Sequence, residues 1–85
     1  MTYANVKVID VGRKPIDDYI FEAVVSFNEG IDVLVLKGRG QFISKAVDVY
    51  NRLYDRLGDS IELEKVEIGT ERRRSYIAIT VRRRL

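Results

Sequence analysis

The spacing of apolar residues in the first part of the chain predicts a strand and then a helix. Val6–Val11 (VKVIDV) is a β-branched run that stops at Gly12, which is typical of a strand. Pro15 suits a first helical turn, and the apolar residues after it recur at the spacing of one helix face. They are Ile16, Tyr19, Ile20, Ala23, Val24 and Phe27, and Asn28 with Gly30 supplies the stop.

The pattern then repeats in a second strand and a second helix. Ile31–Leu36 (IDVLVL) is almost continuously apolar, as in a strand that is covered on both faces. A helix is predicted to follow and to stop at Gly58. Its apolar face is expected to hold Ile43, Ala46, Val47, Tyr50, Leu53, Tyr54 and Leu57. Phe21 and Val25 lie off the first helix's stripe, on a flank that could meet a second subunit.

The last third of the chain is β-like. Ile61 and Leu63 alternate with acids in one phase, whereas Val66 and Ile68 alternate in the other. Strand side chains have a period of two, so this shift predicts a bulge near Glu64–Lys65. A final strand is expected at residues 76–81 (YIAITV), after a hairpin tip at residues 69–75 (GTERRRS).

The element order β-α-β-α-β-β indicates one α/β domain of the two-layer α+β kind, spanning residues 1–85, with a mixed sheet and two helices. Strand–helix–strand crossovers are nearly always parallel and right-handed, so the first three strands should run in one direction. The loops Gly12–Pro15, Gly38–Gln41 and Gly69–Ser75 then share one edge of the sheet. This edge is called the basic edge below.

Composition excludes several classes of protein. The chain has neither Cys nor His, so disulfides, thiolate chemistry and the usual zinc ligands are not expected. No catalytic set can be assembled, and we expect neither an enzyme nor a cofactor or metal site. The glycine pair Gly38 and Gly40 does not fit a dinucleotide fingerprint, because Ile43 stands where the third glycine belongs. The sequence has no signal-peptide pattern and no apolar run long enough for a membrane span, so a cytoplasmic protein is expected.

The net charge is only +2, but the charges are strongly segregated. The three basic clusters are Arg13 and Lys14; Lys37, Arg39 and Lys45; and Arg72, Arg73 and Arg74 with Arg82, Arg83 and Arg84. They hold 11 of the 15 basic residues, whereas the remainder carries all 13 acids. Most of the positive charge maps to the basic edge, which favours binding of a polyanion. The run Arg82–Arg84 should instead lie at the opposite end of the last strand.

Simpler readings stay open for some of these residues. Gly38 and Gly40 could serve only the strand-to-helix turn, and the C-terminal arginines could be a solvated tail. Asp17 and Asp18 fit the positive end of the first helix better than a metal site. Tyr19, Tyr50 and Tyr54 fall on the predicted buried faces, so core packing is favoured over stacking on bases.

Three stretches of the sequence resemble the Alba family of small archaeal chromatin proteins that bind DNA and RNA. They are GRKP after the first strand, NEGID before the second, and KGRGQFISKAVD at the second helix. The likeness covers residues 6–82, and residues 36–59 resemble most closely the second paralogue of archaea that have two. The fold also resembles the C-terminal domain of a bacterial translation initiation factor.

This resemblance implies a dimer that binds double-stranded DNA, and RNA, without sequence preference, near the chromosome. Its two hairpins would reach along the minor groove. Arg13 and Lys14 match the family's paired lysines, and Arg39 matches the arginine before the second helix. With the charge pattern, the expected contacts to nucleic acid are Arg13, Lys14, Lys37, Arg39, Lys45, Arg72, Arg73 and Arg74.

Departures from the family pattern leave two alternatives open. Arg13 stands at the family's acetylated lysine, although Lys14 remains, and Gln41 replaces a residue that is often basic. Leu57 stands where many members use Phe for contacts between dimers. The chain could therefore act mainly on RNA, as the Alba-like subunits of RNase P suggest, or as a heterodimer partner that modulates another Alba paralogue.

Overall fold

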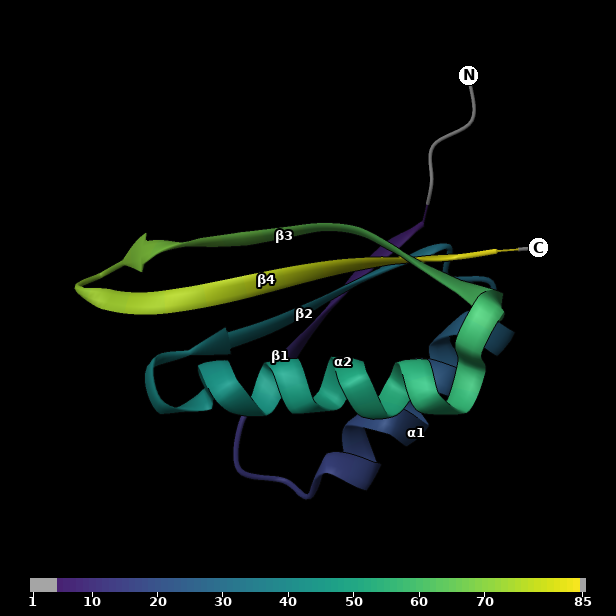
Figure 1. The fold of residues 1–85 in the computed structure, drawn as a ribbon, viewed down its shortest axis with the longest axis horizontal. Coiled ribbons are helices and arrows are strands. Elements are labelled where there is room, and N and C mark those ends of the chain that lie inside the picture. Colours follow the sequence, from purple (N-terminus) through teal and green to yellow (C-terminus); the bar gives the residue numbers. More distant parts are fainter. Residues whose placement is uncertain (1–4, 85) are drawn as a thin grey trace.

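The computed structural model describes residues 5–84. Figure 1 shows a four-stranded sheet with both helices on one face. The elements are β1 (Val6–Val11), α1 (Ile16–Asn28), β2 (Val33–Arg39), α2 (Ile43–Leu57), β3 (Ile61–Glu71) and β4 (Arg74–Arg83). Short 3-10 turns at Gly40–Phe42 and Gly58–Ser60 flank α2. Neither α1 nor α2 has the length and apolar content needed to cross a bilayer.

The sheet order is β1-β2-β4-β3, so the last strand lies between the second and the third. β1 pairs with β2 in parallel, and β4 is antiparallel to both β2 and β3. The first three strands therefore run in the same direction, as predicted. The pairing of β3 with β4 shifts register between Leu63 and Lys65, which confirms the predicted bulge.

The core lies between the sheet and the two helices, and α2 supplies its centre. Ala46, Val49 and Leu53 are completely buried there. Tyr54, which was expected on the buried face, is 48% exposed. Successive helical residues are rotated by about 100°, and Tyr54 lies one such step from Leu53. The prediction for Tyr54 was wrong because the true centre of the face runs through Val49, which the predicted stripe left out.

The second strand was predicted at residues 31–36 but occupies Val33–Arg39. Lys37, Gly38 and Arg39 thus belong to the sheet and not to a loop. Gly38 lies under the start of α2, where a Cβ would come within 2.3 Å of the Phe42 carbonyl oxygen. The turn itself is made by Gly40, whose φ of 56° is in the left-handed region that suits glycine.

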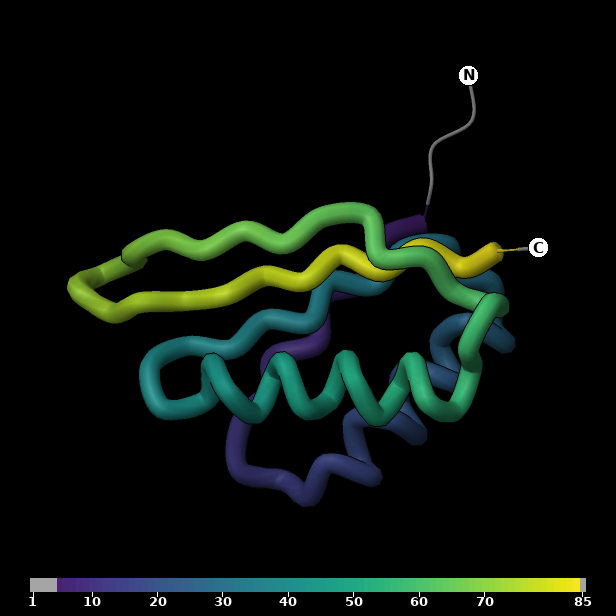
Figure 2. Tube along the Cα trace, in the orientation of Figure 1, coloured from purple at the N-terminus to yellow at the C-terminus, as the bar shows by residue number. Residues whose placement is uncertain are grey.

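The β3–β4 hairpin continues past the end of β2, as Figures 1 and 2 show. Arg39, the last residue of β2, pairs with Tyr76, whereas β3 and β4 remain paired out to Glu71 and Arg74. We call residues 70–75 the hairpin arm. Its turn residues, Arg72 and Arg73, have φ angles of 50° and 68°.

Candidate nucleic-acid interface

The ends of β1, β2 and β3 lie at one edge of the sheet, as predicted. The predicted loops were too long, because Gly38 and Arg39 belong to β2 and only residues 72–73 of the hairpin tip predicted at 69–75 form the turn. β1, β2 and β3 point the same way, so the loops that follow them share that edge. Lys45, at the start of α2, reaches the loop after β1. Glu71, at the end of β3, reaches the cations at the end of β2. These contacts link Lys45 to the loop that carries Arg13 and Lys14, and Glu71 to Lys37 and Arg39.

The loop after β1 is held by two side chains that reach it from the helices. The Tyr19 hydroxyl, on α1, accepts hydrogen bonds from the backbone amides of Gly12, at 2.8 Å, and Lys14, at 3.2 Å. The Lys45 ammonium donates to the carbonyl oxygens of the same two residues. The side chains of Arg13 and Lys14 are left exposed. Tyr19 and Lys45 thus position a loop that presents two cations.

Tyr19 is 2% exposed, so the expectation that it packs in the core is confirmed. Its hydroxyl also holds the loop after β1, a role that the helical spacing could not indicate. Lys45 was expected to supply charge to a ligand. The structure uses its ammonium for the loop's carbonyl groups, with the Tyr19 ring centroid 5.7 Å away.

At the end of β2, two basic side chains lie on the sheet face that is turned away from the helices. Lys37 is only 19% exposed in its side chain, with its ammonium 4.9 Å from the Tyr76 ring centroid and 2.9 Å from a Glu71 carboxylate oxygen. Arg39 lies 3.0 Å from Asp10 and 3.7 Å from Glu71. The hydrogen bond from Lys37, helped by the charges of Lys37 and Arg39, holds the pKa of Glu71 below its usual value.

A recess of about 630 Å³ lies between the end of β2 and the hairpin arm. Its lining residues are Arg39, Glu71, Arg72 and Arg74. The Arg74 guanidinium lies against Gly40, where a Cβ would be 2.8 Å from the nearest guanidinium nitrogen. Gly40 therefore has two requirements, a left-handed backbone and room for Arg74. The recess is suited to an anion, because three of its four lining side chains are cationic.

The tip of the hairpin arm presents three exposed arginines, Arg72, Arg73 and Arg74. None of them forms an ion pair with a carboxylate between residues 5 and 84. Two positive φ angles in succession are typical of a type I′ turn, which normally takes Asn-Gly. A left-handed conformation costs a side-chain-bearing residue about 1–2 kcal/mol. The arm therefore carries both unpaired charge and backbone strain.

The C-terminal arginines lie at the opposite end of the sheet, as predicted. Arg82 pairs with Val33, at the start of β2. Each of the three faces a carboxylate: Arg82 lies 3.1 Å from Glu64, Arg83 3.1 Å from Asp32, and Arg84 3.9 Å from Glu62. Arg83 also donates to the Phe27 carbonyl oxygen. These contacts give the run a structural environment and separate it from the basic edge.

Sequence reasoning missed two acids that enter the basic edge, Asp10 and Glu71. Asp10 lies opposite Lys37 in the β1–β2 pairing and bonds to Arg39. Glu71 meets Lys37 and Arg39 because the hairpin folds beside β2. Finding this pair requires the sheet order, with β4 between β2 and β3, and the spacing of apolar residues does not contain that order.

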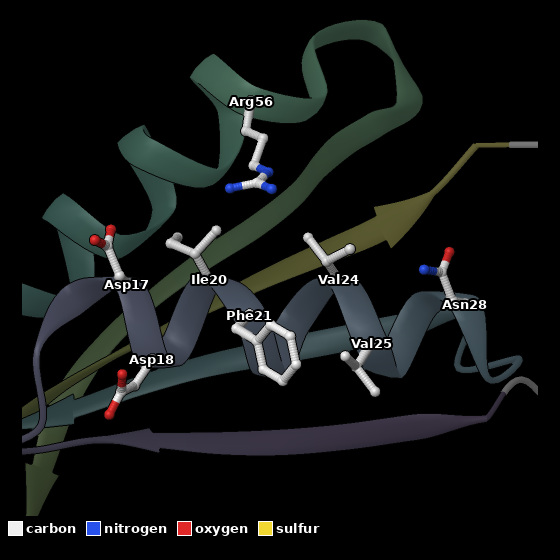
Figure 3. A pocket seen from close by; sticks show the side chains of 8 residues that line it. All are labelled: Asp17, Asp18, Ile20, Phe21, Val24, Val25, Asn28 and Arg56. Carbon is white, nitrogen blue, oxygen red and sulfur yellow. The ribbon is translucent and has the colours of Figure 1, made fainter.

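A groove of about 630 Å³ along α1 is a second surface feature, and none of its lining residues belongs to the basic edge (Figure 3). It is lined by Asp17, Asp18, Ile20, Phe21, Val24, Val25, Asn28 and Arg56. Phe21 is 71% exposed, in agreement with its predicted place off the buried stripe. Leu57, next in sequence to Arg56, is half-buried and packs at the border of the core.

Comparisons with known proteins agree with this architecture. The family model described as Alba matches residues 7–70. A DNA/RNA-binding protein Alba 2 from Saccharolobus solfataricus is 50% identical over 74 residues, which cover 82% of this chain and 83% of that protein. A DNA/RNA-binding protein Alba from Methanocella arvoryzae is 41% identical over 64 residues, which cover 75% of this chain and 67% of that protein.

Solved structures give the same result. Alba from Thermoplasma volcanium superposes with a TM-score of 0.82 at 33% identity, over 91% of this chain and all of that one. ALBA1 from Trypanosoma brucei reaches a TM-score of 0.82 at 19% identity, over 89% of this chain and 68% of that one, and supports the fold alone. The family model matches most of this chain, and a curated relative is 50% identical to it. This chain therefore belongs to the Alba family.

Proposed function

We propose that this protein binds nucleic acid, double-stranded DNA and also RNA, through the basic edge and the hairpin arm. The observation that carries the proposal is the arm itself: three exposed arginines without carboxylate partners among residues 5–84, beside a recess lined by Arg39. The backbone at Arg72 and Arg73 is strained, and Asn-Gly would relieve that strain. Arginine at these two positions therefore does not serve folding, which favours a role in binding. The names of the relatives as DNA/RNA-binding proteins support the same function.

The arrangement favours recognition of the phosphate backbone over recognition of bases. The cations stand on the loop after β1, at the end of β2, at the start of α2 and on the two-stranded arm, all towards one edge of the sheet. Such contacts position a protein on a duplex but carry no sequence information. We therefore propose similar affinity for unrelated sequences, and an architectural role at the chromosome in place of catalysis.

We further propose that the functional unit is a dimer that uses an apolar strip on β3. Leu63, Val66 and Ile68 lie opposite the buried residues Val81, Ile79 and Ile77 of β4, so they share the sheet face that carries the helices. They nevertheless remain exposed, Ile68 by 79%. A row of exposed apolar side chains on one strand is suited to a symmetric contact between two copies.

The proposal has one refinement that rests on a second surface and one alternative target. The groove on α1, which Phe21 helps to line, is a second surface that could join one dimer to the next, or to a different Alba paralogue. Leu57 lines a neighbouring hollow that shares Val24 and Asn28 with this groove. RNA as the main target remains the alternative, because phosphate contacts serve both polymers. Binding to duplex DNA and to structured RNA at matched salt separates these two targets.

The test is a salt titration of duplex binding, measured by fluorescence anisotropy. Each cation that neutralises a phosphate adds about 0.9 to the slope of log affinity against log salt. Replacing Arg72, Arg73 and Arg74 together with Ala should flatten the slope by roughly 2 to 3 units. Arg39→Ala alone should remove about 1 unit.

The matched control is the triple replacement of Arg82, Arg83 and Arg84, which removes the same charge from the opposite end of β4. It should change the slope distinctly less, because these arginines lie at the end of β4 that is opposite to the basic edge, where Arg82 pairs with Val33. A larger loss from the C-terminal triple than from the tip triple would mean that the wrong edge was assigned.

A further inference from the structure

Glu71 is one of two acids, with Asp10, on a surface whose other charged groups are cations. It ends β3, directly before Arg72, and its two carboxylate oxygens accept hydrogen bonds from the Lys37 ammonium at 2.9 and 3.1 Å. Arg39 approaches the same carboxylate to 3.7 Å. Glu71 also lines the recess, together with Arg39, Arg72 and Arg74. Any anion that enters the recess therefore meets three cations and one carboxylate.

The fold itself has little need of this carboxylate. Its side chain is 43% exposed, and exposed ion pairs contribute little to stability. The hairpin is already held in register by ten residue pairs of β3 with β4, from Ile61–Arg83 to Glu71–Arg74. The neighbouring cations keep the pKa of Glu71 low, so the group carries a full negative charge at neutral pH. Its chief effect is electrostatic, on whatever binds at the recess.

The geometry also shows what Glu71 resembles. A carboxylate that accepts from an ammonium and faces a guanidinium occupies the position that a phosphodiester oxygen would take on the same two cations. Lys37 is poorly accessible, with its ammonium held between Glu71 and the Tyr76 ring. It can serve a ligand only if it leaves Glu71 or if the ligand shares it.

We propose that Glu71 is a resident anion at the hairpin base, which a phosphodiester of the bound nucleic acid displaces from Lys37 and Arg39. The inference rests on the proposed function and deepens it. Glu71 lowers the affinity of the basic edge and removes about one charge from its salt dependence. Glu71 competes with the phosphodiester for Lys37 and Arg39 and so lowers affinity, whereas the arginines around it raise affinity.

The test compares Glu71→Gln with Glu64→Gln by salt titration on one DNA duplex. Glu64 is a matched control: it lies on the same strand, is 40% exposed in its side chain against 43% for Glu71, and pairs with one cation, Arg82. Both substitutions raise the net charge by one. Glu71→Gln should steepen the salt slope by about 0.9, which corresponds to roughly eightfold tighter binding at 0.1 M salt. Glu64→Gln should leave both quantities nearly unchanged.

A second comparison tests displacement against a simple change of net charge. In a Lys37→Met background, one of the two cations that Glu71 holds is absent, so the gain from Glu71→Gln should shrink clearly. An undiminished gain would overturn the displacement idea. So would equal effects of Glu71→Gln and Glu64→Gln in the parent protein. If the parent protein bound neither duplex DNA nor RNA at low salt, the proposed function itself would fail, and that result is distinct from the other two.

Discussion

Arg72 and Arg73 adopt a backbone conformation that few side chains favour, at the most exposed point of the hairpin arm. A type I′ turn needs positive φ at both central residues, and Asn-Gly satisfies this at the lowest cost. Arginine brings no such advantage. The cost is tolerated because a long pairing of β3 with β4 holds the turn closed on both sides.

Replacing Arg72 with Asn and Arg73 with Gly should therefore stabilise the fold while weakening binding. We expect the free energy of unfolding to rise by about 1–2 kcal/mol, measured by urea denaturation. The salt slope for duplex binding should fall by roughly 2 units, because two cations are lost. Lysine at both positions is the control, since it keeps the charge and the strain. A less stable Asn-Gly variant would show that the turn is not strained.

The titratable residues predict affinity that does not depend on pH near neutrality. The chain has no His and no Cys. Hydrogen bonding from Lys37 lowers the pKa of Glu71, and hydrogen bonding to Glu64 raises that of Arg82, so both groups stay charged. Duplex affinity should be flat from pH ~5.5 to ~8 by anisotropy. A clear titration in that range would contradict this prediction and would require a carboxylate or lysine at the site with a strongly shifted pKa.

Below that range the sign follows from the lowered pKa of Glu71. Its contribution to stability is complete above the ordinary value of 4.5 and is lost as the pH falls through the lower value of the folded state. The Glu71→Gln variant should lack the part of the acid-induced loss of stability that comes from protonation of Glu71.

Among the elements, the pattern of apolar residues predicted strand directions and the bulge better than it predicted boundaries. The phase change between Leu63 and Val66 located the bulge because strand periodicity is strict. The pattern missed the extension of β2 through Lys37 and Arg39, since charged residues at a strand end look like a loop. It also could not give the contacts of Glu71, which depend on which strands are neighbours. Charge clustering located most of the basic edge, but only the sheet order revealed its acids.

The end of α2 offers a prediction about contacts between dimers. Leu57 is half-buried, and Arg56 beside it lines the α1 groove (Figure 3). A larger apolar side chain at this position would project more surface toward a neighbouring molecule. Leu57→Phe should therefore increase the cooperativity of binding along a long duplex, measured as the Hill coefficient in a gel-shift titration.

Leu57→Met is the control for this change, because it alters shape with little change in volume. Combining Leu57→Phe with Phe21→Ser should cancel the gain if the groove is the surface that receives it. Unchanged cooperativity in Leu57→Phe would separate this position from assembly altogether.

At the scale of the whole molecule, the small size of the chain and its apolar strip predict a dimer in solution. With 85 residues, the chain can bury only a modest core, and Leu63, Val66 and Ile68 lie on its surface. Light scattering at micromolar concentration should give the mass of two chains, with or without nucleic acid. Ile68→Glu should shift the population towards monomer by placing a charge in the contact.

Phe21→Glu is the matched control, since Phe21 is similarly exposed but lies on α1. It should leave the dimer intact. A folded monomer for the parent chain would contradict the dimer, and dissociation by Phe21→Glu alone would move the contact from β3 to α1.

The exposed arginine tip also has a consequence for the lifetime of the protein. Enzymes that cleave after basic residues attack exposed loop tips first, and Arg72–Arg74 offers three adjacent cleavage points at the end of a projecting arm. A cut there would break the covalent connection between β3 and β4. If nucleic acid covers the arm, bound molecules are shielded and unbound ones are degraded first, so the amount of protein would follow the amount of polymer available to hold it.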